Sequence, residues 1–109
     1  MHLIDYAFPN YDDVLPMIKG FDDASYKNDS APSIHKLLSK DIYLVLYCDY
    51  KNKKRRENPE SFRYSLCLDM PMILCNAKYL YACDDIVEMK HFIDNHTIDD
   101  YINMKEFFD

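Results

Sequence analysis

Ile42-Tyr-Leu-Val-Leu-Tyr-Cys48 is the clearest strand signal in the sequence. Its residues are β-branched, aromatic or otherwise apolar, and a run that is apolar on both faces is typical of a central strand. After the polar segment 51–61, apolar and more polar side chains alternate along residues 62–68, which predicts a half-buried strand. The two strands and the charged segment between them predict an antiparallel hairpin.

Helices are predicted on the C-terminal side of this hairpin. Asp85 with Glu88, and Thr97 with Asp100, have the spacing of capping boxes, in which side chains satisfy the first backbone N–H groups of a helix. Apolar residues at helical spacing follow each pair, so we expect two amphipathic helices. Residues 72–82, which precede these helices, predict one more strand or two short ones.

The N-terminal part of the chain predicts a strand and then a helix. Apolar residues alternate along residues 3–8, which indicates a short strand. Asn10 is a good N-cap, and apolar residues at helical spacing follow it. Pro16 would shorten or kink this helix, and Gly20 would end it.

A second helix is predicted immediately before the central strand. Residues 22–33 are polar and indicate a loop. Ser30 or Ser33 could cap a helix whose apolar side chains are Ile34, Leu37 and Leu38. We expect this helix to end near Lys40.

These elements predict an α+β domain with a small antiparallel sheet of three to four strands and helices packed on one face. The expected order is β-α-α-β-β-β-α-α. A chain of 109 residues has the length of one domain, and no linker or repeat divides it. We therefore interpret residues 1–109 as a single globular domain.

The composition excludes several classes of enzyme. Gly20 is the only glycine, so neither of the glycine-rich loops that hold nucleotide phosphates can be formed. No nucleophile elbow can be recognised either. The sequence predicts no cofactor and no enzymatic activity.

The charges are separated along the chain. Residues 1–35 carry six acids and two bases, residues 36–63 carry eight bases and four acids, and residues 64–109 carry nine acids and three bases. The net charge of −6 favours a basic protein partner and disfavours direct binding of nucleic acid. We expect no membrane partner, because no apolar run is long enough to span a bilayer.

The chain has four cysteines, an even number that is compatible with disulfides. However, the N-terminus lacks the basic and apolar segments of a signal peptide. We therefore expect a cytoplasmic protein in which the thiols are reduced and mostly buried.

Two kinds of chemistry can be considered for the cysteines and histidines. Cys75, Cys83, His91 and His96 are ligand types that zinc accepts, but their spacing lacks the usual close cysteine pair, so we predict no metal site. Cys83 precedes a predicted helix, where the helix dipole would lower the pKa of a thiol. A small enzyme that uses Cys83 and a histidine therefore stays an alternative hypothesis.

A basic segment occupies the predicted hairpin connection. From Lys51 to Arg56, five of six residues are lysine or arginine. Such a segment can contact phosphate or an acidic partner, or it can be a solvated loop tip. Because no aromatic residue lies within it, we favour the solvated loop.

Acidic residues and tyrosines occur together in several predicted loops. Tyrosine is enriched at protein interfaces, and neighbouring carboxylates would pair with the arginines and lysines of a basic partner. The sequence therefore predicts an inhibitor of the immunity-protein or antitoxin type, which occludes the active site of a basic bacterial toxin, such as a nuclease. The alternative is a phage-type inhibitor of a nucleic-acid-handling complex, which would use the same acidic surface to mimic the charge of nucleic acid. The residues predicted to bind the partner are Asp12, Asp13, Asp22, Asp23, Tyr26, Asp49 and Tyr50.

Overall fold

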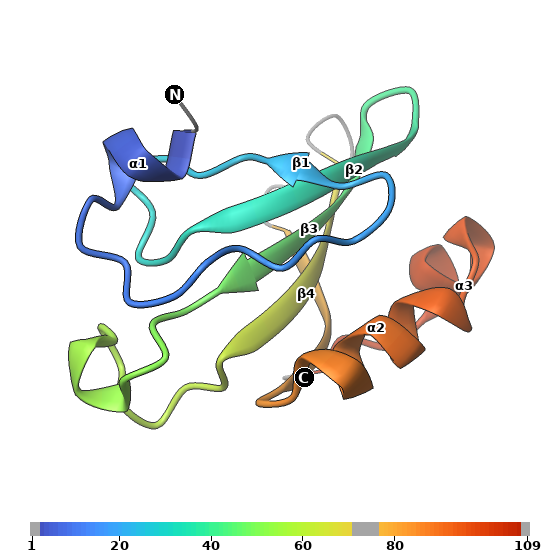
Figure 1. Ribbon diagram of the computed structural model, residues 1–109. Helices are drawn as coiled ribbons and strands as arrows, with labels where there is room; N and C mark the ends of the chain where they lie inside the picture. The colour runs from blue at the N-terminus through green and yellow to red at the C-terminus, as the bar shows by residue number, and fades with distance from the viewer. Residues whose placement is uncertain (1–2, 71–76, 108–109) are drawn as a thin grey trace.

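The computed structural model describes residues 3–70 and 77–107 and confirms the α+β class (Figure 1). An antiparallel sheet has the strand order β1-β2-β3-β4-β5, so it contains five strands where the sequence predicted three to four. The elements are α1 Leu3–Ala7, β1 Asp22–Asp23, β2 Ser33–Ser39, β3 Ile42–Cys48, η1 Lys53–Arg55, β4 Tyr64–Asp69, β5 Lys78–Cys83, α2 Ile86–Asp94 and α3 Ile98–Asn103.

The hairpin formed by β3 and β4 lies at the centre of the sheet, as predicted. The two strands pair antiparallel from Tyr43↔Asp69 to Cys48↔Tyr64. Along β3 the side chains alternate between buried and half-buried, because successive residues point to opposite faces. We call the face of Leu44, Leu46, Cys48, Tyr64, Leu66 and Leu68 the inner face, and that of Tyr43, Val45, Tyr47, Ser65, Cys67 and Asp69 the outer face.

The segment predicted as the second helix is strand β2. It pairs with β3 from Ser33↔Tyr47 to Ser39↔Ile42, with an irregularity between Leu37 and Ser39. Ile34 is buried, whereas Leu37 is 57% exposed, so the two side chains do not form one apolar helical face. The turn to β3 places Asp41 at φ 59°, a left-handed conformation that Asp and Asn tolerate better than most residues.

The predictions for residues 3–21 were wrong. Residues 3–7 form helix α1 instead of a strand, and the Phe8 N–H donates to the Ile4 carbonyl at 2.8 Å. The segment between α1 and β1 runs irregularly across the sheet, without the predicted helix (Figure 1). Pro9 and Pro16 have no backbone N–H to donate, which disfavours a helix there. Leu15, Ile18 and Phe21 from this segment instead pack against the core.

The two C-terminal helices begin where the capping signals predicted. Asp85 caps α2 by accepting a hydrogen bond from the Val87 N–H, and Thr97 and Asp100 form a capping box at α3. Glu88 does not complete a box with Asp85, because its carboxylate accepts a hydrogen bond from the Tyr81 hydroxyl. Helix α2 packs against β5, and the buried residues of the two helices join the core with the inner face of the sheet.

Strand β5 lies at one edge of the sheet and is covered by the chain's own C-terminal segment. The Phe107 N–H donates to the Tyr79 carbonyl at 2.9 Å. The Lys78 ammonium donates to the carbonyls of Tyr101 and Ile102 at 3.1 and 3.0 Å. The part of the predicted 72–82 strand that precedes residue 77 lies outside the described residues. Among the described helices, none has the length and apolar character needed to cross a bilayer.

Candidate functional site

Three of the predicted partner-binding residues line one groove. Asp13, Asp22 and Asp23 surround a groove of about 810 Å³ between α1, residues 13–19 and the first two strands. Asp5 lines it as well, and Lys19 is the one basic residue in its lining. We call this surface the N-terminal groove.

The N-terminal groove combines exposed apolar side chains with carboxylates. Val14 is 80% exposed and Met17 is 92% exposed, although both belong to the lining. Within residues 3–70 and 77–107, no hydrogen bond or ion pair engages the side chains of Asp5 and Asp22. Two charges are therefore available to a partner beside two apolar side chains.

The other two acids of the groove are used inside the molecule. Asp13 forms an ion pair with Arg63 at 2.6 Å, and the Arg63 guanidinium holds the pKa of Asp13 below its ordinary value. Asp23 accepts hydrogen bonds from the N–H groups of Ile4 and Ser25 at 2.8 and 3.0 Å. These contacts fix the shape of the groove and leave its net charge negative.

Asp12, Asp49 and Tyr50 are not in the groove but support the basic segment. The two Asp12 oxygens accept hydrogen bonds from the N–H groups of Lys51 and Asn52, both at 2.8 Å. Asp49 accepts hydrogen bonds from the Tyr50 N–H at 2.8 Å and the Ser61 hydroxyl at 3.3 Å. The roles found for Asp12 and Asp49 are thus structural.

Tyr50 and Tyr26 have different surroundings. The Tyr50 ring packs against Tyr11, with ring centroids 5.5 Å apart, and the Arg55 guanidinium lies 4.8 Å from its centroid. Tyr26 is exposed, and its hydroxyl accepts a hydrogen bond from the Asn28 amide at 3.0 Å. Tyr26 keeps a free ring surface, whereas Tyr50 is partly covered.

The basic segment is less solvated than expected, because Arg56 is buried with only 6% of its surface exposed. Its guanidinium donates to the carbonyls of Tyr50, Ser61 and Lys51 at 2.7, 2.8 and 3.4 Å. Arg55 donates to the Asn10 carbonyl. The three lysines of the segment are exposed, so the buried Arg56 holds the loop while the lysines cover its tip.

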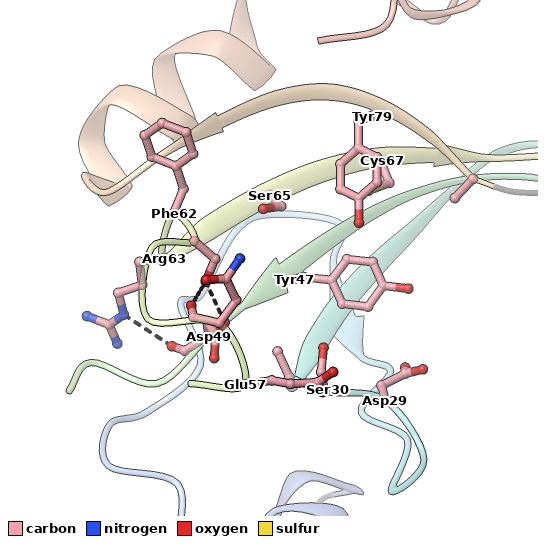
Figure 2. A pocket seen from close by; sticks show the side chains of 14 residues that line it. Asp29, Ser30, Tyr47, Asp49, Glu57, Phe62, Arg63, Ser65, Cys67 and Tyr79 are labelled. Atoms are coloured by element: carbon pink, nitrogen blue, oxygen red, sulfur yellow. Dashed lines mark hydrogen bonds between the residues drawn. The ribbon is translucent and has the colours of Figure 1, made fainter. Parts of the chain in front are cut away.

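A second concave surface lies on the outer face of the sheet and was not predicted from the sequence. This outer-face cleft of about 540 Å³ is bounded by β3, β4, β5, the turn at residues 29–31 and the loop at residues 57–63. Figure 2 shows the Tyr79 side chain pointing toward Tyr47 across the sheet, with Asp29 at the Tyr47 end. Ser65 and Cys67 from β4 also line the cleft.

Burial controls the electrostatics of the outer-face cleft. It raises the pKa of Asp29 above its ordinary value and raises that of Tyr47 to about 12, with the Asp29 charge contributing to the second shift. In the described part of the chain, no hydrogen bond or ion pair engages the carboxylates of Asp29 and Glu57. Two uncompensated acids therefore line the same cleft as Tyr47 and Tyr79.

The surroundings of the Cys83 thiol differ from those expected from the sequence. Burial raises the pKa of the Cys83 thiol to about 11, so proximity to the start of α2 does not lower it. The Cys83 thiol contacts the Asp85 carbonyl at 3.3 Å, and His96 Nδ1 lies 2.6 Å from the Phe92 carbonyl. Among residues 3–70 and 77–107, no three potential ligands gather as a metal ion would require, and Cys75 lies outside these ranges.

Comparison with known proteins identifies no relative of this chain: no protein-family model matches it, and neither does any curated protein or solved structure. The function of the chain must therefore be inferred from its own surfaces and charge. Sequence patterns indicated Asp13, Asp22 and Asp23 of the N-terminal groove but not Asp5. They did not indicate the outer-face cleft, which depends on strand pairing.

Proposed function

We propose that this chain is a non-enzymatic acidic binding protein that neutralises a basic protein, such as a bacterial toxin with nuclease activity. It would act as an immunity protein or antitoxin does, by occluding the active site of its target. The observation that carries the proposal is the N-terminal groove, in which Asp5 and Asp22 accompany the exposed side chains of Val14 and Met17.

The apolar side chains of the groove would supply the affinity of such an interface. Interfaces between proteins typically have an apolar centre and a polar rim, and methionine is enriched in them because its side chain adapts to irregular surfaces. Val14 and Met17 both line the groove and are largely exposed, so they would lose solvent if a partner covered them. An apolar residue of the partner would therefore be buried against them.

The carboxylates would supply orientation and fast association. A nuclease presents lysine and arginine where it binds phosphate, so an acidic surface can occupy the same place. Complementary charge raises association rates and makes them depend on salt. The acids of the groove and the net charge of −6 both favour a partner of this kind.

The test is capture of a basic protein from lysate of the native host by three tagged forms of the full chain. The wild type is compared with Asp5→Lys/Asp22→Lys in the groove and with Asp94→Lys/Asp99→Lys on exposed positions of α2 and α3. Both double variants change the net charge equally. The recovered protein is then assayed for toxicity and nuclease activity with and without the wild-type chain.

The proposal expects a stoichiometric basic protein bound by the wild type and by the helix variant but not by the groove variant. Association should slow as salt is raised, and binding should inhibit the activity of the recovered protein. Equal capture by both double variants would place the interface elsewhere. Capture without inhibition, or no capture by any form, would contradict the proposed function.

A further inference from the structure

The outer-face cleft has walls that suit a flat organic cation. Tyr47 from β3 and Tyr79 from β5 both belong to its lining, and so does Asp29, whose charge contributes to the raised pKa of Tyr47. The electron-rich faces of tyrosine rings attract cations within about 6 Å of their centroids. The strand pairing Cys67↔Tyr79 and Val45↔Cys67 keeps these tyrosines on the same face of the sheet.

Two carboxylates also line the cleft. Asp29 comes from the turn before β2, and Glu57 comes from the loop after the basic segment. Asp29 is half-buried, and within the described residues no cation neutralises it. Arg63 also lines the cleft, but its charge is paired with Asp13 at 2.6 Å. The cleft therefore lacks a cation of its own for these two acids.

We propose that the outer-face cleft binds an arginine side chain presented by another protein, with the guanidinium against the Tyr47 ring and its N–H groups donating to Asp29 and Glu57. Arginine fits this cleft better than lysine, because a planar guanidinium stacks on aromatic rings and donates in two directions at once. The burial of the Asp29 carboxylate makes a compensating cation favourable there. This site is separate from the N-terminal groove and does not depend on the function proposed for that groove.

The experiment maps peptide binding onto the full chain labelled with ¹⁵N, by recording amide shifts in two-dimensional NMR spectra. The probes are the blocked tripeptides Gly-Arg-Gly, Gly-Lys-Gly and Gly-citrulline-Gly. Citrulline has nearly the shape of arginine without its charge. The arginine peptide should give saturable shifts at Ser30, Tyr47 and Ser65. The lysine and citrulline peptides should bind at least about tenfold more weakly, a difference of roughly 1.4 kcal/mol in binding free energy.

Three variants locate the effect. Asp29→Asn keeps the shape of the side chain and removes its charge, so it should weaken arginine binding about tenfold, the size expected for a charge-assisted hydrogen bond. Tyr47→Leu should weaken it as well, because the aromatic wall is lost. Asp22→Asn in the N-terminal groove is the control and should leave the affinity unchanged. The dispersion of each spectrum reports whether the variant is folded.

Several results would overturn the proposal. Equal affinities for the arginine and citrulline peptides would show that charge is not recognised, and equal affinity for lysine would contradict a guanidinium site. Shifts that cluster at the N-terminal groove, or no shifts at millimolar peptide, would also contradict it. Because the groove variant is measured in parallel, a failure of arginine binding in the cleft can be distinguished from a failure of the function proposed for the groove.

Discussion

The two faces of the central hairpin are built from alternating residues of the same strands, yet they are held in different ways. On the inner face, Leu44, Leu46, Leu66 and Leu68 are at most 1% exposed and contact the helices and the N-terminal segment. On the outer face, tyrosines and polar residues stay half-buried beside a cleft. Apolar burial therefore stabilises the first face, whereas hydrogen-bonded loops shape the second.

The largest effect should come from adjacent residues on opposite faces. Leu46→Ala should lower the free energy of unfolding by about 3 kcal/mol, because it leaves a cavity in a packed core. Tyr47→Ala, one residue along β3, should cost roughly 1 kcal/mol, because its side chain is only half-buried. Urea denaturation of both variants measures the difference. Equal losses would mean that the outer face is as tightly packed as the inner one.

A smaller effect is expected where hydrogen bonds shape the rim of the cleft. Arg56→Met keeps the apolar part of the side chain but removes the donors to three carbonyl oxygens, so it should cost about 2 kcal/mol. Lys54→Met in the same loop is the matched control and should change the stability by less than about 0.5 kcal/mol. Thermal and urea unfolding of the two variants measure these changes in stability. If the two variants are equally stable, Arg56 does not hold the loop.

The third prediction compares one thiol from each face by its pH dependence. Burial raises the pKa of Cys48 and of Cys67 from 9.0 to about 12. Above pH 9 the unfolded chain loses these protons before the folded chain does. The contribution of the two thiols to the free energy of unfolding is therefore fully present below pH 9 and is lost as pH rises toward 12. Each thiol can lower the free energy of unfolding by up to about 1.4 kcal/mol per pH unit in this range.

Urea denaturation between pH 7 and pH 11 checks this expectation. Cys48→Ala and Cys67→Ala should each make the decline less steep, whereas Ser65→Ala, which removes no titrating group from the outer face, should leave it unchanged. If the stability of Cys67→Ala falls with pH as steeply as that of the wild type, the thiol on the outer face is more solvated than the thiol on the inner face. That result would sharpen the contrast between the two faces.

The parts of the fold that the sequence predicted correctly depend on local signals. The β3–β4 hairpin follows from an uninterrupted apolar run and a period of two, and α3 follows from its capping box. Strand β2 was mistaken for a helix because Ile34, Leu37 and Leu38 have helical spacing. Its irregularity between Leu37 and Ser39 disturbs the alternation by which a strand is recognised.

The segment after α1 shows the same limit of local patterns. Val14, Met17, Ile18 and Phe21 have the spacing of a helical face, but two of them are almost fully exposed and two contact the core. The choice between helix and irregular chain is made by Pro16 and by the tertiary contacts of Leu15, which periodicity does not represent.

The residues predicted to bind a partner are brought together only in part. Asp13, Asp22 and Asp23, all named from the sequence, line one groove, and the structure adds Asp5 to it. Composition could not show that both oxygens of Asp12 accept backbone N–H groups some 40 residues away. The outer-face cleft depends on the pairing of three strands with two loops, and a single sequence shows alternation but not pairing partners.

The cover on strand β5 has a consequence for behaviour at high concentration. An uncovered sheet edge presents free N–H and C=O groups to which another molecule can add a strand, and this is a route to aggregation. Here the Phe107 N–H already occupies the Tyr79 carbonyl, and the strand at the opposite edge, β1, consists of two aspartates. Strand addition by another molecule is therefore disfavoured at Tyr79 and along β1.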